Sequence, residues 1–479
     1  MVSPAVFILH EQFSGINREK DFGADRSAAH APACVEEVSL LKESELGLRT
    51  SVILMAGRGL RMSPWVLGAA LVAAAFFAAG CSSGEQSGEE SRAPTVTIVS
   101  DLPLQGSSRP QNESIVNAIN LALEQRNNKA GDVQINYQSQ DNASAQTGYW
   151  DEAKCAENAQ TAAQDEEIVG WIGPFNSGCA EVQIPILNKA GLAMVSPATA
   201  ALGLTKPSAD PDEPGTYYPN GERNFVRLIV THDKQARAGA LWMQDLGVRS
   251  VYILDDQSTG GKNTTNEFGQ TARELGIEVL GHEGIDLGAS DYRSLMEKIA
   301  QLSPDAIYFG GIAAENAGQL VKDKVGAGMS NEDVIFMGPD GINDQAFIDA
   351  AGDEGDGTYV TYGSLFPSEL PKKGQEFVRQ YTKRFGSGAK PYTANGYEAA
   401  NVLLDAIDRA YQDDGEVTRK GVVRELLATQ NYHGVLGTWS FDEDGDATLT
   451  KVSVEKVENG KFEFYRTIDI GKISGSRKG

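Results

Sequence analysis

The chain has 479 residues, enough for two or three domains, and its 41% hydrophobic and 23% charged residues are ordinary for a globular protein. Asp and Glu number 66 against 42 Lys and Arg, so the formal net charge is −24. Because a nucleic-acid partner needs a basic face for its phosphates, this balance argues against nucleic-acid binding, and we interpret the acidity as a source of solubility.

A targeting segment is predicted before residue 100. Arg58 and Arg61 precede the apolar run 65–79, and small residues then lead to Cys81. This order of a basic region, an apolar core and small residues is typical of a secretory signal, so residues 55–80 are predicted to be a signal peptide. The run is shorter than the roughly 20 apolar residues that span a bilayer. An uncleaved anchor helix is the less favoured alternative.

The small residues before Cys81 resemble a bacterial lipobox, although Ala78 stands where that motif usually has leucine. The expected mature protein therefore begins at a lipidated Cys81 and is tied to the outer face of the cell membrane, or lies in the periplasm. Residues 1–54 precede the signal and are interpreted as a mis-assigned leader. Residues 81–93 are rich in Ser, Gly and Glu, a composition that predicts a flexible tether.

From residue 95 the sequence alternates between short β-branched runs and segments with apolar residues at helical spacing. The first run of predicted elements is strand 95–100, helix 113–128, strand 133–141, helix 156–166, strand 168–174, helix 180–191 and strand 192–197. A second run is strand 250–256, helix 267–276, strand 277–282, helix 292–302, strand 305–311, helix 315–328, strand 334–339 and helix 343–352. This alternation predicts an α/β protein with two doubly wound parallel-sheet lobes.

A further helix is predicted over 392–411, and strands with hairpins over 437–468, where Asp-Gly and Asn-Gly pairs are turn signals.

No catalytic, cofactor or metal site is predicted. His232, His282 and His433 lack metal-binding spacing, and the glycine-rich stretch 255–264 departs from a Walker motif at two positions. The acidic stretch 442–446 lacks the glutamate of a calcium loop and is interpreted as a hairpin turn.

Cys155 and Cys179 are predicted to form a disulfide. Export permits the bond, and adjacent βα units bring the start of one helix close to the end of the next strand. Two buried free thiols remain the alternative.

The stretch "IGPFNSGCAEVQIP" (172–185) contains the strongest indication of a binding site. A strand ends, a polar turn with Asn176 and Ser177 comes next, and a helix begins, so backbone amides at the helix start suit a carboxylate. A plain N-cap is the alternative reading of these two residues. The stretch 195–205 repeats the arrangement one βα unit later, and open parallel sheets bind ligands at this edge.

These stretches, together with "VSDLPLQGSS", "PILNKAGL", "FVRLIVTHDKQA", "YFGG", "FMGPDG" and "TWSFDEDGD", resemble the type I periplasmic-binding-protein family. The resemblance is to its leucine/isoleucine/valine-binding proteins of ABC importers and covers roughly 94–470. It implies a monomeric two-lobed receptor that closes on an amino acid and delivers it to an ABC permease in the membrane. The implied lobes and hinges are lobe 1 at 94–227 plus 364–437, lobe 2 at 230–361 plus 440–470, and crossings near 226–231, 361–365 and 437–441.

On the first lobe, the resemblance implies that the ligand's carboxylate and ammonium are held by the two turn segments. Ser177 matches the family's turn serine. Ala198 matches a position that acts through its carbonyl, whatever its side chain. Ala200 replaces a family threonine and leaves only its amide, with Thr199 beside it.

On the second lobe, the resemblance implies that Asp340 receives the ligand's ammonium. Tyr397 matches an aromatic pocket position, whereas Thr259 and Ile312 stand where amino-acid binders often have tyrosine. Arg109 adds a charge near the end of the first strand.

Two functions from different classes are compatible with these features. The first is the solute receptor of an importer, with a branched-chain or related amino acid as ligand. The second is a sensory module of the same fold that signals to a membrane partner. We expect no second membrane-spanning helix and no cytoplasmic domain, which weakens the sensory alternative. A permease and an ATPase encoded beside the gene would favour transport.

Overall fold

The computed structural model describes residues 94–146, 148–208 and 210–472, all within one compact unit of the chain. The predicted leader, signal peptide, lipidated Cys81 and tether lie outside this range, so they stay predictions. Within it, no helix is long and apolar enough to cross a membrane.

The first lobe is built on a mostly parallel sheet with strand order β2-β3-β1-β4-β5-β6. Its strands are β1 (Thr95–Leu102), β2 (Lys129–Ala130), β3 (Val133–Asp141), β4 (Ile168–Ile172), β5 (Ala193–Ser196) and β6 (Phe225–Arg227). Its helices are α1 (Arg109–Gln125), α2 (Glu152–Gln164), α3 (Ser177–Lys189), α9 (Lys372–Phe385), α10 (Thr393–Asp414) and α11 (Arg419–Leu427), and the small hairpin β12 (Tyr432–Gly434) and β13 (Gly437–Trp439) adjoins them.

The second lobe is built on a sheet with strand order β15-β14-β11-β10-β9-β7-β8. Its strands are β7 (Ser250–Asp255), β8 (Glu278–Gly284), β9 (Ala306–Gly310), β10 (Ile335–Gly338), β11 (Tyr359–Tyr362), β14 (Lys451–Val457) and β15 (Phe462–Asp469). Its helices are α4 (His232–Asp245), α5 (Thr259–Glu274), α6 (Arg293–Ala300), α7 (Gly318–Gly326) and α8 (Gln345–Ala351). β14 pairs antiparallel with β11 and β15, so the C-terminal hairpin extends an otherwise parallel sheet.

Both sheets are covered on both faces because successive residues of a strand point to opposite sides. In β1, Ile98 packs with the apolar residues of α1 and α10, whereas Val99 packs with those of α2 and α3. In β7, Ile253 belongs to the cluster under α4 and α5, whereas Leu254 belongs to the cluster under α6, α7 and α8. The central strands are buried on both sides, as in doubly wound sheets. The predicted fold class is confirmed.

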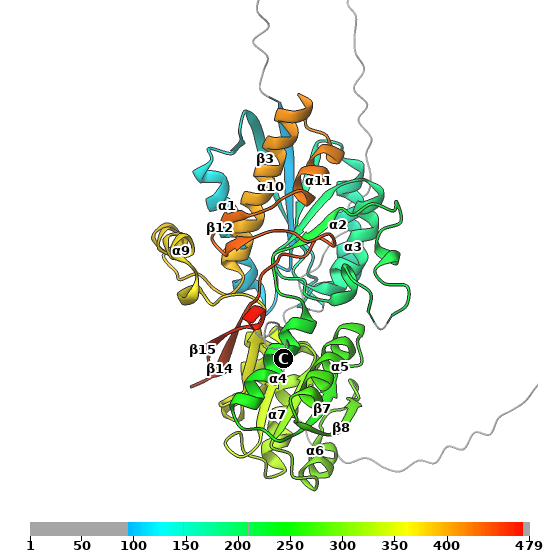
Figure 1. Ribbon diagram of the computed structural model, residues 1–479, viewed down its shortest axis with the longest axis vertical. Helices are drawn as coiled ribbons and strands as arrows, with labels where there is room; N and C mark the ends of the chain where they lie inside the picture. Colours follow the sequence, from blue (N-terminus) through cyan, green and yellow to red (C-terminus); the bar gives the residue numbers. More distant parts are fainter. Residues whose placement is uncertain (1–93, 147, 209, 473–479) are drawn as a thin grey trace, which may run out of the picture. The chain divides into compact units, whose positions relative to one another are not determined.

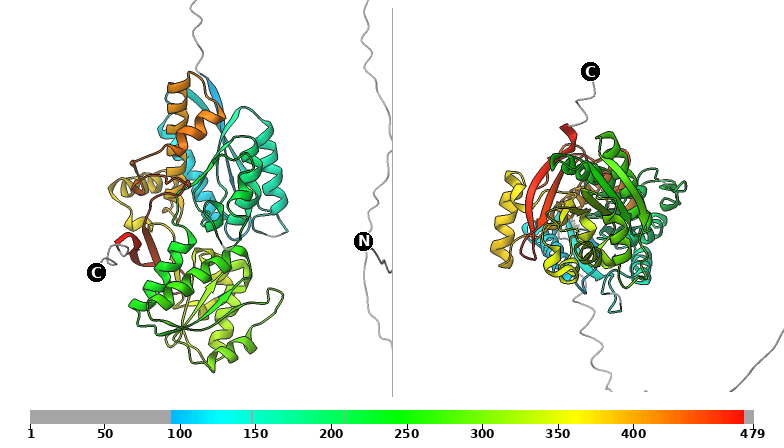
Figure 2. Two further views of the ribbon diagram at one scale, coloured as in Figure 1. Left: turned by 45° about the vertical axis from the view of Figure 1, so that its right-hand side comes forward. Right: turned by 90° about the horizontal axis from the view of Figure 1, so that it is seen from below.

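Each lobe is assembled from distant parts of the chain. α10 and α11 follow the second-lobe strand β11 in sequence, but α10 packs on α1 and α11 packs on β4 and β5. In Figures 1 and 2 these orange helices therefore lie with the blue and cyan elements of the first lobe. The chain therefore passes between the sheets three times, after β6, after β11 and between β13 and β14. This three-crossing arrangement agrees with the architecture that the resemblance implies.

Local predictions are confirmed at several positions. Cys155 and Cys179 form a disulfide, with Cα atoms 5.7 Å apart, so the free-thiol alternative is wrong. The acidic stretch 442–446 is a turn closed by a bridge between Phe441 and Ala447. The Asn-Gly pair at 459–460 turns β14 into β15 with both residues at positive φ. The helices α4, α9 and α11 were not predicted individually from the sequence.

Candidate functional site

A cavity of about 340 Å³ lies at the carboxyl ends of strands from both sheets. Segments after β4 and β5 line it from the first lobe, and segments after β7, β9 and β10 line it from the second. Ligands of open parallel sheets bind at this edge, and the volume suits a small molecule. The cavity is therefore the candidate ligand site.

The first wall of the cavity is built around the start of α3. Asn176 is the N-cap residue, with extended backbone (φ −95°, ψ 139°) and no capping hydrogen bond from its side chain. The first backbone bond of the helix runs from Ala180 N to Asn176 O (3.1 Å), so the amides of the first turn precede the helical hydrogen-bond ladder. Ser177 lines the cavity, and its Oγ accepts a hydrogen bond from Ala201 N (3.2 Å). This arrangement suits an anion.

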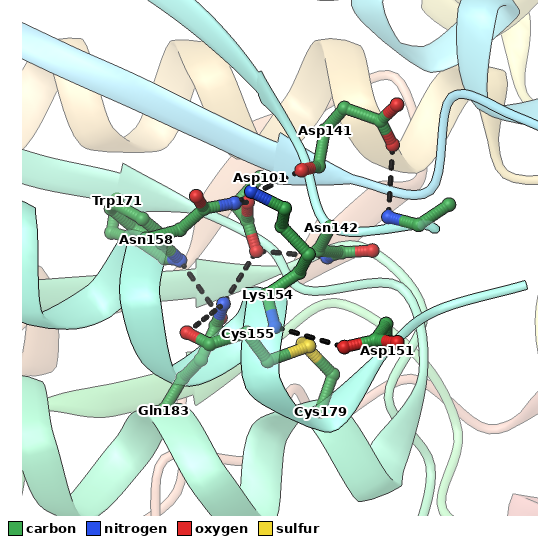
Figure 3. Close-up of a disulfide and its surroundings, with 11 residues drawn as sticks. Asp101, Asp141, Asn142, Asp151, Lys154, Cys155, Asn158, Trp171, Cys179 and Gln183 are labelled. Atoms are coloured by element: carbon green, nitrogen blue, oxygen red, sulfur yellow. Dashed lines mark hydrogen bonds between the residues drawn. A yellow bond between two sulfur atoms is a disulfide. The ribbon is translucent and has the colours of Figure 1, made fainter. Parts of the chain in front are cut away.

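A buried network behind the first wall fixes the position of α3 (Figure 3). The Asp101 carboxylate accepts hydrogen bonds from three side-chain amides, those of Asn142 (2.8 Å), Asn158 (2.7 Å) and Gln183 (2.5 Å). Burial raises the pKa of Asp101 to about 6, and the three amide donors oppose that rise. Since Asn158 lies on α2 and Gln183 on α3, Asp101 and the Cys155–Cys179 disulfide together join both helices to the end of β1.

The second turn segment comes directly after β5. Ser196 Oγ accepts hydrogen bonds from the amides of Ala198 (3.2 Å) and Thr199 (2.9 Å), which holds the turn in place. Ala198 and Ala200 line the cavity, and the Ala200 carbonyl accepts a hydrogen bond from His232 N (2.8 Å) in the second lobe. Thr199 is fully buried and does not line the cavity, and its hydroxyl has no hydrogen-bond partner among the described residues.

Asp340 projects from the second wall, directly after β10. Its Oδ2 accepts hydrogen bonds from the Tyr392 hydroxyl (2.7 Å) and from Gln235 Nε2 (3.2 Å). Its Oδ1 lies 3.6 Å from His232 Nε2. Gly341 is needed beside it, because a Cβ there would come within 2.7 Å of the Gly311 carbonyl oxygen. The structure thus brings five of the residues named from sequence to one cavity: Ser177, Ala198, Ala200, Asn176 and Asp340.

Tyr392 was missed in the sequence analysis. It lines the cavity from the first lobe, in a left-handed backbone conformation (φ 62°) directly before α10, and its ring packs against Phe175 (centroids 5.1 Å apart). Burial, followed by the charge of Asp340, raises the pKa of Tyr392 well above its usual value, so the hydroxyl stays protonated and donates to Asp340. A lone aromatic at a predicted helix start was the only available signal.

Besides Thr199, two further predicted site residues, Tyr397 and Arg109, do not line the cavity. Tyr397 is the fifth residue of α10 and faces α9, where its ring packs on Phe377 (centroids 4.5 Å apart) and its hydroxyl donates to Gln125. Arg109 begins α1, is exposed to solvent and pairs with Glu113 (2.6 Å). Neither residue lines the cavity.

The cavity lining also includes carboxylates that the sequence did not single out: Glu181, Asp256 and Glu315. Burial raises the pKa of each of the three. Within the described ranges, no group of three or more His, Cys, Asp or Glu side chains is placed to hold a metal ion.

Known proteins match most of this chain in sequence. The model of the periplasmic binding protein family matches residues 95–461. The chain is 26% identical over 373 residues to the Leu/Ile/Val-binding protein homolog 2 of Brucella abortus (strain 2308), an alignment that covers 76% of this chain and 91% of the relative.

Two solved structures share the fold. The leucine-binding protein LivK of Thermotoga maritima matches with a TM-score of 0.67 and 24% identity, over 79% of this chain and 99% of that one. The substrate-binding protein LivJ of a Streptococcus pneumoniae branched-chain amino acid transporter, solved with isoleucine, matches with a TM-score of 0.64 and 21% identity, over 78% of this chain and 99% of that one.

Proposed function

Because the chain belongs to the periplasmic binding protein family, we propose that it is the solute receptor of an ABC importer and closes its two lobes on an amino acid. Membership of this family implies an extracytoplasmic location. The relatives named for leucine, isoleucine and valine support an amino acid as the class of ligand.

One observation carries the proposal: the cavity presents opposite chemistry on its two walls. The start of α3 with Ser177 offers amide and hydroxyl donors to a carboxylate. Asp340, on the opposite wall, offers a carboxylate to an ammonium group. An α-amino acid has both groups, so it would contact both lobes at once. Because only contacts that differ between two states can shift their equilibrium, such a ligand would favour the closed state.

The proposal also includes anchoring of the receptor at the membrane and delivery of its ligand to a permease. A lipidated Cys81 would hold the receptor at the membrane, and residues 81–93 would let the lobes reach an ABC permease. Mass spectrometry of the membrane fraction should detect a lipidated Cys81 peptide and no peptide from residues 1–54. Abundant peptides from 1–54 would contradict the assignment of the start.

A sensory module of the same fold remains the second candidate, since it would use the same cavity. Transport and sensing are separated by deleting the gene and measuring uptake of the bound amino acid. Lost uptake supports the importer, whereas unchanged uptake with a lost transcriptional response supports the sensor.

Isothermal titration of the purified protein with amino acids tests the ligand class directly. We expect saturable binding with one ligand per chain. Absence of binding to every amino acid, in a protein that unfolds cooperatively, would contradict the proposed function.

A further inference from the structure

The wall that the second lobe contributes to the cavity is strongly acidic. Asp256 after β7, Glu315 after β9 and Asp340 after β10 all line it, and Glu181 of α3 adds a fourth carboxylate from the first lobe. The described residues that line the cavity include no Lys or Arg, and His232 is their single basic side chain. An α-ammonium group needs one carboxylate, so three remain without a stated role.

Asp256 is the best-defined of these carboxylates. It is 4% exposed, and its Oδ1 accepts hydrogen bonds from the amide (3.0 Å) and hydroxyl (2.5 Å) of Ser258. Both of these bonds go to Oδ1, which leaves Oδ2 to a ligand. Residue 261 must be glycine for the carboxylate to fit in this position, because a Cβ on Gly261 would lie 2.1 Å from Oδ1 of Asp256. A buried carboxylate is therefore fixed at the cavity wall through one of its two oxygens.

Glu315 lies in the irregular turn Ala313–Ala317 and lines the same cavity as Asp256. Burial raises the pKa of Glu315, and the charge of Asp256 raises it further. Two carboxylates that share a partly buried space without a cation between them repel each other. A cation from the ligand would relieve that repulsion.

We infer that the ligand has a second cationic group, on its side chain, which Asp256 and Glu315 bind while Asp340 binds the α-ammonium group. The ligand class is then an amino acid with a basic side chain, such as lysine, ornithine or arginine. The inference rests on the proposed function and narrows it. Ammonium and guanidinium groups donate well to paired carboxylates, and the cavity volume accommodates a side chain of this length.

Matched ligand pairs test the inference. Lysine and norleucine differ by the terminal ammonium, and arginine and citrulline differ by the guanidinium charge. In titrations at pH 7.5, lysine and arginine should each bind about tenfold or more tightly than the uncharged partner, as expected for a charge pair removed from water. Glu315→Gln, at a partly exposed position that should not affect folding, should reduce this ratio. The double variant Asp256→Asn with Glu315→Gln should bring it close to one.

Asp255→Asn is the matched control. Asp255 is as buried as Asp256 and precedes it in the chain, but it pairs with His282 (3.0 Å) and does not line the cavity. This variant should keep the preference for lysine. If wild-type protein binds norleucine and citrulline as tightly as lysine and arginine, the inference is wrong while the proposed function stands. If no amino acid binds, both fail.

Discussion

The two walls of the cavity differ in how they present charge. Around Ser177, Ala198 and Ala200 the first-lobe wall offers backbone amides, a serine hydroxyl and alanine methyl groups, and Glu181 adds one carboxylate to it. The second-lobe wall includes three carboxylates, Asp256, Glu315 and Asp340, of which Asp340 and Asp256 are nearly buried. The part of the first wall around Ser177 can bind an anion through dipoles, whereas the carboxylates of the second wall can bind cations through full charges.

The difference arises from the residues that come directly after each strand. After β4, α3 begins at once and its N-cap side chain makes no capping bond, so the amides of the helix start are open to a ligand. After β7, α5 also begins, but Ser258 Oγ accepts a hydrogen bond from Gly261 N (2.9 Å) and Asp256 Oδ1 accepts from Ser258 N. The start of α5 is thus satisfied by its own residues. Similar βα units therefore give an anion site on one wall and a carboxylate on the other.

Removing the Asp340 carboxylate from the second wall should have the largest effect on amino-acid affinity. Asp340→Ala should weaken amino-acid binding by roughly 30-fold or more, since truncating one partner of a desolvated charge pair costs about 2–5 kcal/mol. Isothermal titration measures the change. Asp349→Ala, at an exposed acid of α8 in the same lobe, changes the net charge equally and should bind like wild type. Equal losses in both variants would contradict a specific role for Asp340.

Loss of the disulfide behind the first wall should lower the free energy of unfolding. Replacing both Cys155 and Cys179 by serine opens a loop of 24 residues, which costs about 3 kcal/mol of unfolding free energy in the chain-entropy account. Denaturant unfolding of the variant should match that of wild-type protein treated with reductant. Unfolding curves that coincide with those of the oxidised protein would show that the bond contributes nothing to stability.

Ser177→Ala should have a smaller effect than Asp340→Ala, because the backbone amides of α3 remain. A single lost hydrogen bond to a charged group corresponds to a weakening of about tenfold. Titration with the same amino acid gives the ratio of the two effects. A loss at Ser177 larger than that at Asp340 would reverse the assignment of roles to the two walls.

The smallest expected effect is on the pH dependence of stability. The pKa of Asp101, behind the first wall, is raised by burial to about 6, and that of Glu455, whose Oε2 accepts from Asn343 near the second wall, to about 7. Both folded-state values exceed the unfolded values of about 4, so the folded state holds these protons more firmly and its stability falls as pH rises from about 4 to 7.

Unfolding free energy measured by denaturant titration across this pH range checks the sign. Asp101→Asn should flatten the decline between about pH 4 and 6, and Glu455→Gln should flatten it up to about pH 7. A stability that rises over the same range would contradict both assignments.

Much of the fold could be predicted from sequence because buried strands alternate regularly with amphipathic helices. The disulfide could be predicted because Cys155 and Cys179 occupy adjacent βα units. Ser177 could be named because it follows a predicted strand and turn, whereas Asp340 was named only through the family resemblance. Tyr392 was not named, because its side-chain direction depends on its own left-handed backbone conformation before α10. Apolar periodicity does not reveal that conformation.

Three other carboxylates of the cavity were also not predicted. They are Glu181, Asp256 and Glu315, which only the packing of the two lobes brings together with Asp340. Asp256 in particular belongs to a glycine-rich stretch whose sequence pattern suggested only a phosphate loop.

The central claim is that one ligand engages both walls through opposite charges. Titration of wild-type protein with norleucine, hexanoate and pentylamine tests it most directly, because hexanoate lacks the α-ammonium and pentylamine lacks the carboxylate. Both analogues should bind about 30-fold or more weakly than norleucine, and Asp340→Asn should bind norleucine and hexanoate with similar affinity. Hexanoate or pentylamine binding to wild-type protein as tightly as norleucine would contradict the account.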